Sequence, residues 1–287
     1  MKKHKICKIL LVILAIFLCV AFYELLGICV AYKKQPEVSN TTKKETKNGS
    51  WNECSENTER AVIIEKNPEA LLQRVRLIKN AKKEIILSTF AFRSDESGKL
   101  ILGALHDAAD RGVHIRLLVD GMESWIDMEG NPYFYGLSSH ENVEIKLYNK
   151  ANPLKPWKIM GRMHDKYLIA DGKRYILGGR NTYNYFLGDF PGHKNYDRDV
   201  LVVCDEPEKE NSVNQLLEYF ETIWEQEDSD YFHDNKKLAN RKSVKNAVLE
   251  LKNGYQKYFE ENKERICDTD YTDETFETEK IALVSNP

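Results

Sequence analysis

Strand and helix patterns alternate between about residue 60 and residue 227, and this alternation limits the fold more than any other feature. Short apolar runs lie at 61–64, 84–92, 113–121 and 142–149. Stretches with apolar residues at helical spacing lie between them, at 68–83 and 96–112. Strands that alternate with helices build βαβ units, whose sheet is covered by helices. The sequence therefore predicts an α/β fold, a mixed β-sheet sandwiched by helices.

Later segments continue the pattern. Residues 162–170 and 173–179 are expected to be two strands joined by a tight turn at Asp171-Gly172, because Asp-Gly between apolar runs favours a hairpin. Another strand is expected at 197–204, and helices at 209–227 and 242–266. The aromatic and Met-rich stretch at 121–141 is expected to be a loop between strands, either packed on the surface or forming a lip that touches lipid.

The N-terminus carries an apolar run from Ile9 to Tyr32 in which Glu24 is the only formal charge. A helix of this length spans the roughly 30 Å of hydrocarbon in a bilayer. Four lysines precede the run, which favours a cytoplasmic N-terminus and a domain on the outer side of the cell membrane. We therefore expect a single-pass transmembrane anchor at 1–34; a cleaved signal peptide is the alternative.

The rest of the chain divides by composition. Residues 35–58 are polar and are expected to form a flexible linker. Residues 59–230 form the predicted catalytic domain, and 231–287 a helical and acidic extension. Cys54 and Cys267 flank the domain and could pair in an oxidising compartment, although their spacing does not establish a disulfide.

A polar cluster follows the hairpin strands. His164 and Lys166 are two residues apart, so in a strand their side chains face the same side. A lysine supplies a positive charge for a phosphate, and an imidazole can attack phosphorus and later leave. Gly178 and Gly179 permit a close backbone approach, and Asn181 can donate to a phosphate oxygen. The two strand ends are therefore expected to form one phosphate-directed site.

The charge distribution agrees with an anionic substrate. The formal net charge of the chain is −3, yet residues 150–200 hold ten Lys or Arg against five Asp or Glu. A basic face over a whole domain, as nucleic-acid binding usually requires, is not evident. Metal-ligand spacings such as CxxC or HExxH are also not found in the sequence.

The complete spacing H-x-K-x4-D-x6-G-G-x-N resembles the signature of the phospholipase D superfamily. The resemblance covers roughly residues 60–230, and the strand and helix order agrees with one repeat of that fold. Residues 61–92, 109–121 and 178–186 further resemble the N-terminal half of bacterial cardiolipin synthases. The positions of the signature are filled by His164, Lys166, Asp171, Gly178, Gly179 and Asn181.

The resemblance implies a two-histidine mechanism without a metal or other cofactor. One histidine forms a phosphohistidine, and a second protonates the leaving alcohol. Asp171 then supports the fold, and Asp199 is preferred over Asp197 as the acidic residue that orients the nucleophile. The implied catalytic set is His164, Lys166, Asp171, Asn181 and Asp199, with substrate bound by Lys166, Gly178, Gly179 and Asn181.

Such enzymes use two copies of the motif, and this sequence contains one. His193 lacks the surrounding pattern and is interpreted as a loop histidine. The second copy is expected either from a homodimer partner or from the missing half of a truncated or split product. The tail at 280–287 is expected to be the opening strand of a second repeat, which favours truncation.

We therefore expect a membrane-anchored enzyme that transfers or hydrolyses phosphatidyl groups, with a phosphatidylglycerol-like phospholipid as substrate. A nuclease homodimer is the first alternative, against which the transmembrane segment and the acidic total charge argue. A catalytically incomplete half that binds anionic headgroups or a partner chain is the second.

Overall fold

The computed structural model describes residues 2–33, 40, 43–44, 59–208, 210–233 and 236–284. Most of the expected linker at 35–58 lies outside the described residues, and so does Cys54. The expected pairing of Cys54 with Cys267 therefore falls outside them too. Cys267 itself is exposed as a free thiol.

A nine-stranded sheet forms the centre of the domain, in the order β8-β4-β3-β2-β5-β6-β7-β1-β9. β2, β3 and β4 pair in parallel, and the other neighbours pair antiparallel. The expected mixed sheet is confirmed. The strands are β1 Glu59–Ile64, β2 Glu84–Thr89, β3 His114–Asp120, β4 Val143–Tyr148, β5 Lys166–Ala170, β6 Arg174–Gly178, β7 Asp199–Val203, β8 Ser229–Tyr231 and β9 Phe276–Thr278.

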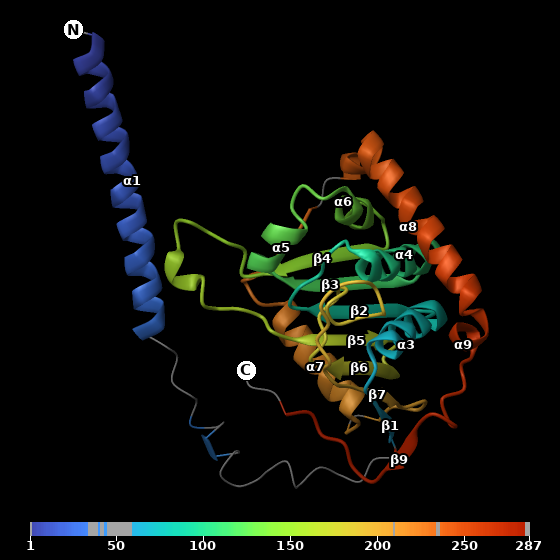
Figure 1. Cartoon of the computed structure of the whole chain (residues 1–287). Helices are drawn as coiled ribbons and strands as arrows, with labels where there is room; N and C mark the ends of the chain where they lie inside the picture. The colour runs from blue at the N-terminus through green and yellow to red at the C-terminus, as the bar shows by residue number, and fades with distance from the viewer. Residues whose placement is uncertain are drawn as a thin grey trace.

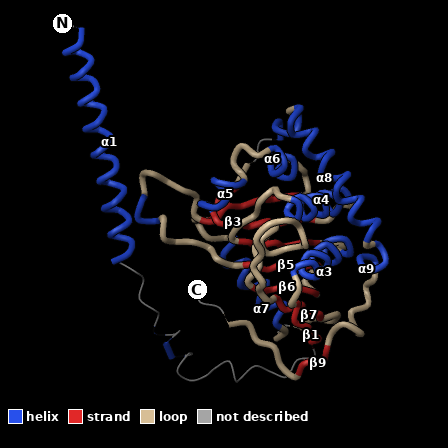
Figure 2. The backbone as a smooth tube through the Cα atoms, in the orientation of Figure 1, coloured by secondary structure: helices blue, strands red, loops and turns tan. Residues whose placement is uncertain are grey.

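Helices cover both faces of this sheet (Figures 1 and 2). One face packs against α3 Asn67–Asn80, α4 Glu96–Asp110, α6 Pro132–Ser138, α8 Lys242–Glu261 and α9 Lys263–Cys267. The opposite face packs against α7 Ser212–Trp224, whose buried residues Val213 and Phe220 contact the sheet residues Ile86 and Tyr175 within one apolar cluster. Because α8 and α9 share the larger core with α3 and α4, residues after 231 pack on the domain.

The stretch at 121–141 differs from the expectation of a loop. It forms α5 Gly121–Asp127 and α6, and each helix begins at a side chain that caps it. Asp120 accepts hydrogen bonds from the amides of Met122 and Glu123, and Asn131 accepts one from Tyr133. Capping side chains satisfy amides that a short helix leaves unpaired, so these residues start helices where aromatic content alone suggested a loop.

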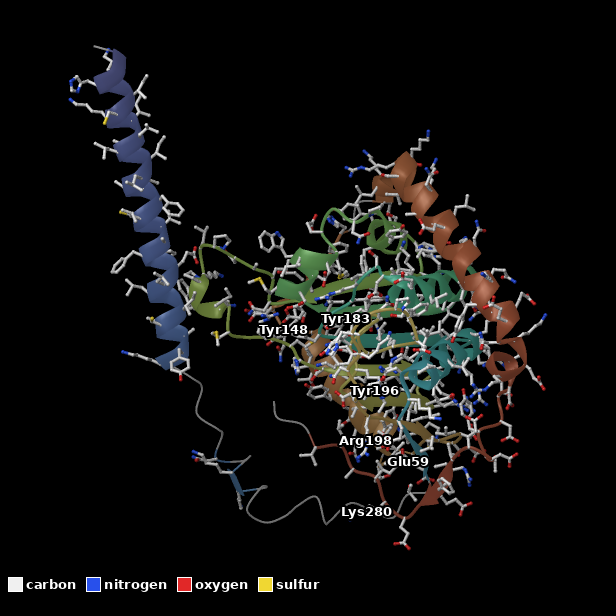
Figure 3. All side chains as sticks on the ribbon, in the orientation of Figure 1. Glu59, Tyr148, Tyr183, Tyr196, Arg198 and Lys280 are labelled. Atoms are coloured by element: carbon white, nitrogen blue, oxygen red, sulfur yellow. The ribbon has the colours of Figure 1, made fainter. Side chains whose placement is uncertain are left out.

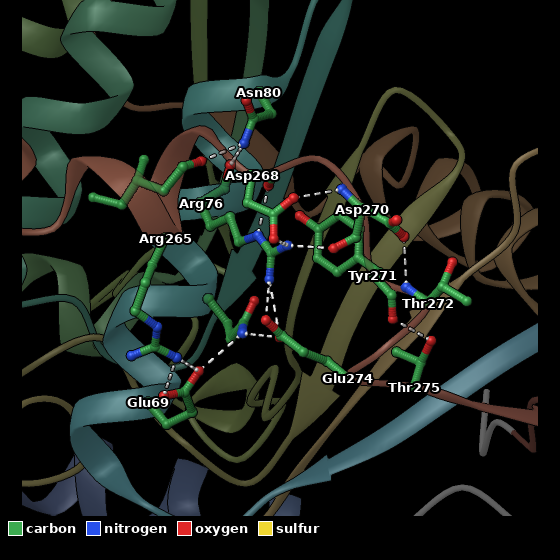
Figure 4. A network of polar contacts seen from close by, with 12 residues as sticks. Glu69, Arg76, Asn80, Arg265, Asp268, Asp270, Tyr271, Thr272, Glu274 and Thr275 are labelled. Atoms are coloured by element: carbon green, nitrogen blue, oxygen red, sulfur yellow. Dashed lines mark hydrogen bonds and ion pairs between the residues drawn. The ribbon is translucent and has the colours of Figure 1, made fainter.

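The segment after α9 is held against α3 by a buried arginine. The guanidinium of Arg76 donates to the backbone carbonyls of Asp268 and Asp270 and to the carboxylate of Glu274 (Figure 4). β9 then pairs antiparallel with β1 at the sheet edge. The tail from 280 to 284 does not continue as a strand, which corrects that expectation for its described part; residues 285–287 lie outside it.

The N-terminal helix α1 Lys2–Lys33 stands apart from the domain over most of its length (Figures 1 and 3). Residues His4–Lys33 are long and apolar enough to cross a membrane, and none of the apolar window is buried in the protein. The helix is therefore a candidate span, as the sequence predicted. Among the described residues, its C-terminal third contacts the loop that carries the short 3-10 helix η2 Pro156–Lys158.

The turn between β5 and β6 is tight and left-handed. Asp171 has φ +55° and Gly172 has φ +63°, as in the type I′ turns that favour hairpins. The Asp171 carboxylate accepts hydrogen bonds from the amides of Lys82, Lys83 and Glu84, where β2 begins. Asp171 therefore joins the hairpin to β2, at the end of β5 away from Lys166.

We predict that Asp171→Ala lowers the free energy of unfolding by about 2–3 kcal/mol, because three amides lose a charged acceptor and alanine tolerates positive φ poorly. Thermal unfolding of the purified full chain in detergent measures the change. Asp189→Ala, at an exposed position of the loop after β6, serves as the control. Equal stability of the two variants would contradict this role.

Candidate active site

The ends of four neighbouring strands meet at one edge of the sheet. β2 and β6 end there, and β5 and β7 begin there, because these strands pair antiparallel in the order β2-β5-β6-β7. Thr89 lies opposite Lys166, and Gly178 lies opposite Asp199. The register therefore brings both halves of the sequence motif to one place.

The aromatic ring of Phe90, directly after β2, contacts the side chains of the first half of the motif. The His164 ring lies 4.6 Å from its centroid, the Lys166 Nζ atom 5.4 Å, and the Arg162 guanidinium carbon 5.0 Å. These three residues alternate along one extended segment, so their side chains share a side. β5 begins only at Lys166. His164 thus precedes the strand rather than lying within it.

The intervening residues point to the opposite face. Met163 and Tyr167 belong to the apolar cluster under α7. The Asp165 carboxylate accepts a hydrogen bond of 2.8 Å from the hydroxyl of Tyr219 on α7. This side of the segment is therefore anchored in the core, which fixes the direction in which His164 and Lys166 project.

His164 and Lys166 influence each other electrostatically. Partial desolvation, followed by the positive charge of Lys166, lowers the pKa of His164 below its ordinary value. Desolvation also lowers the pKa of Lys166, while the charges of Asp165 and Asp197 act in the opposite direction. Lys166 is buried, and its Nζ donates to the His164 carbonyl at 2.7 Å. The lowered pKa of His164 favours the neutral form of its imidazole.

Asn181 is fixed by the chain that follows β2. Its side-chain oxygen accepts a hydrogen bond of 3.2 Å from the amide of Ala91, so the side-chain nitrogen lies on the other side of the amide as a donor. The next residue, Thr182, exchanges backbone hydrogen bonds with Ala91 and Arg93. Asn181 is thereby held at the same sheet edge as Lys166.

The two glycines allow close packing against the start of β7. A Cβ atom on Gly178 would clash with the Asp199 carboxylate, and one on Gly179 would clash with the Asp197 carboxylate. Glycine is needed at these two positions for steric reasons, since neither residue has a positive φ. The glycines therefore allow Asp199, the first residue of β7, and Asp197, just before it, to lie close to the site, in addition to the approach to substrate expected of them.

The contacts of Asp199 and Asp197 differ, and the preference for Asp199 as the orienting residue stays a prediction. Its Oδ2 atom pairs with Arg74 at 2.9 Å and with Arg180 at 3.2 Å, and both guanidinium groups are buried. Arg180 also donates to the carbonyls of Ile64 and Glu65. Asp197, in contrast, lies close enough to Lys166 for its charge to affect the lysine. Asp199 therefore ties β7 to α3, and both carboxylates lie at the sheet edge that carries the motif.

Asp120, Arg162 and Phe90 also lie at the site, although the sequence did not single them out. Asp120 is buried at the end of β3 and accepts hydrogen bonds from the Arg162 guanidinium and the Met163 amide. It therefore positions the segment that carries His164. The position of Asp120 at the end of an apolar strand could have indicated this role from the sequence. Nothing in the sequence indicated that Phe90 would contact the residues of the site.

The other expectations concern residues outside this cluster. Asp171 lies at the far end of β5, as described above. His193 is exposed in the loop before β7, with its ring 5.6 Å from Tyr185. Within the described ranges, no group of three or more His, Cys, Asp or Glu side chains is arranged to hold a metal ion.

Residues 74–224 match the family model described as cardiolipin synthase, PLD-like domain. The chain belongs to this family. The PLD-like domain match includes every residue of the signature found in the sequence.

Two relatives illustrate the relationship. An uncharacterized protein of Helicobacter pylori is 30% identical over 212 residues, which cover 69% of this chain and 39% of that protein. Cardiolipin synthase C of Escherichia coli is 28% identical over 171 residues, 55% of this chain and 34% of the relative. The PLD-like chain thus spans about two fifths of the length of the first relative and about a third of the second.

A solved structure agrees with the fold. Phosphatidylserine synthase of Haemophilus influenzae aligns with a TM-score of 0.52 and 17% identity, over 77% of this chain and 48% of that chain. At this identity the likeness supports the PLD-like fold alone.

Asp199, at the start of β7, and Asp197, two residues before it, give a matched test within the PLD-like domain. We predict that Asp199→Asn lowers the free energy of unfolding by about 3–5 kcal/mol, because two buried guanidinium groups lose their shared carboxylate. Asp197→Asn, at a partly exposed position, is expected to change stability by less than about 0.5 kcal/mol. Thermal unfolding of both full-length variants decides the matter. The reverse order of stability would contradict the assignment.

Proposed function

We propose that this chain is a membrane-anchored phospholipase D-type enzyme that acts on phosphatidyl groups through a phosphohistidine intermediate. The observation that carries the proposal is the gathering of His164, Lys166 and Arg162 on the Phe90 ring. It places a neutral imidazole beside two cations, and a phosphodiester needs both a nucleophile and charge neutralisation. Membership of the family of cardiolipin synthase PLD-like domains supports the same chemistry.

The reaction divides into two steps. A nitrogen of His164 attacks phosphorus, the bond from phosphorus to the leaving alcohol oxygen breaks, and a second histidine gives that oxygen its proton. Water or another alcohol then attacks phosphorus, loses its proton to the second histidine, and the bond between phosphorus and His164 breaks. Lys166 and Asn181 donate to the nonbridging oxygens throughout. Asp199 is proposed to orient groups of the site, with Asp197 as the alternative.

The second histidine is proposed to come from another PLD-like half. The sequence contains a single H-x-K pattern with its Gly-Gly and Asn context. A twofold dimer would place two such sheet edges opposite each other, because a twofold interface brings the same residues of both copies together. A separate half that carries its own motif would serve equally well.

The substrate is proposed to be an anionic phospholipid such as phosphatidylglycerol, handled by transfer or hydrolysis. α1 would hold the domain at a membrane, with its N-terminus in the cytoplasm and the domain outside. The domain limits proposed for this enzyme are an anchor at 1–34, a linker at 35–58, a catalytic domain at 59–230 and a C-terminal extension at 231–287.

Turnover of phosphatidylglycerol in lipid vesicles by the purified full chain, alone or together with a separate half that carries its own motif, tests the proposal. We predict that His164→Ala lowers the rate roughly 1000-fold or more, because the nucleophile is lost. His193→Ala, an exposed histidine of the same region, is the matched control and should leave the rate nearly unchanged. A headgroup-binding half would show no turnover and unchanged lipid binding in His164→Ala, and that result would overturn the proposal. Metal-independent cleavage of DNA without phospholipid turnover would overturn it as well.

A mixture of wild-type and His164→Ala chains distinguishes the two sources of the second histidine. If two copies build each site, equal amounts leave about one quarter of the dimers active, because both histidines must be present. If each chain works instead with a separate half, supplied in equal amount to every sample, about one half of the activity remains. The His193→Ala chain mixed in the same ratio controls for dilution.

A further inference from the structure

A group of exposed apolar side chains lies beside the candidate site. The loop at 151–161 carries Leu154, Trp157 and Met160, and α5 carries Trp125 and Ile126. Between 45% and 77% of each of these side chains is exposed. Large apolar side chains that are exposed together mark an interaction surface more often than they occur by chance.

The backbone of this loop aligns its apolar side chains. Hydrogen bonds from Lys155 to Asn152, from Lys158 to Lys155 and from Gly161 to Lys158 all connect residues three apart. Side chains at this spacing fall on one side of a 3-10 turn. Leu154, Trp157 and Met160 have the same spacing, and these hydrogen bonds gather the three exposed apolar residues on one short segment of turns.

The candidate span fixes where this surface lies. The Tyr23 hydroxyl donates to the Leu154 carbonyl at 2.8 Å, and the backbone at Gly27 packs directly on Pro156. Val30 and Tyr32 line a cavity together with Trp157 and Met160. These contacts cover about 14 Å at the C-terminal end of the apolar run, since a helix rises about 1.5 Å per residue. The loop therefore lies along the C-terminal part of the candidate span, on the side where α1 would leave the hydrocarbon.

The single charge of the apolar run is turned toward the loop. Glu24 lines a cavity of about 340 Å³ between α1, α5 and the loop, and the same cavity is lined by the basic residues Lys150, Lys155, Lys158 and Arg162. A carboxylate in a spanning helix is costly when it faces lipid and is usually turned toward protein or a polar cavity. Arg162 also lies on the Phe90 ring, so this cavity adjoins the candidate site.

We propose that the 151–161 loop and α5 form a second membrane-contacting element, which sits in the boundary between headgroups and acyl chains of the bilayer that α1 crosses. This inference rests on the proposed membrane anchoring. Tryptophan and leucine side chains are suited to that boundary, and Lys155 is exposed next to them for anionic headgroups. The element holds the sheet edge with His164 at the lipid surface, and the cavity beside Arg162 connects that surface with the site.

Tryptophan quenching by lipids brominated on their acyl chains tests the proposal on the full chain in vesicles. Trp157 and Trp125 are expected to be quenched, so Trp157→Phe and Trp125→Phe each remove a quenched part of the emission. Trp224, buried between α7 and the sheet, is the matched control, and Trp224→Phe should remove only unquenched emission. Emission from Trp157 and Trp125 that does not respond to brominated lipid would overturn the proposal.

This measurement does not require turnover, so its failure is distinct from failure of the proposed enzymatic function. A second measurement covers the case in which α1 alone determines proximity to lipid. Leu154→Asp should reduce turnover of phosphatidylglycerol in vesicles severalfold and leave turnover of a short-chain, water-soluble phosphatidylglycerol unchanged. Leu249→Asp, at an exposed apolar position on α8, serves as the control. Equal loss on both substrates would overturn the proposal.

Discussion

The structure depends on the pairing register of β2, β5, β6 and β7. A strand has a side-chain period of two, so a shift of one residue would turn His164 and Lys166 into the core under α7 and expose Asp165 and Tyr167 instead. Contacts at both ends of β5 hold the register. Asp171 binds the amides at the start of β2, and the Phe90 ring at the end of β2 supports the residues before β5.

Buried ion pairs hold the same strands in place from the face of the sheet that α3 covers. Asp199 joins Arg74 of α3 to Arg180, and Arg180 continues to the backbone at the end of β1. Arg76, two residues after Arg74 on α3, holds the C-terminal segment through Glu274. Pairing of this kind is costly to break, because one partner's loss leaves an uncompensated charge in the interior. The acidic C-terminal segment is therefore part of the domain's packing.

The fold class was predictable from the sequence because apolar periodicity is a local property. The apolar runs at 61–64, 84–92 and 113–121 form β1, β2 and β3, with helices between them as expected. The shared side of His164 and Lys166 followed from strand geometry in the same way. The partners of Asp199 and the contacts of the Phe90 ring were not predictable, because both arise between segments far apart in the chain. The short helices α5 and α6 were not predicted, because the expectation of a loop rested on aromatic composition and did not consider the capping side chains that start both helices.

Detection of the covalent intermediate tests the central role of His164 most directly. The full chain is mixed with phosphatidylglycerol, denatured within the turnover time and digested, and the peptide that carries the phosphatidyl group is identified by mass. We expect the adduct on the His164 imidazole, with the lability in acid and stability in base of a phosphorus–nitrogen bond. It should be absent in His164→Asn and retained in His193→Asn. Turnover with the adduct on a different residue, or an adduct that survives His164→Asn, would contradict this role.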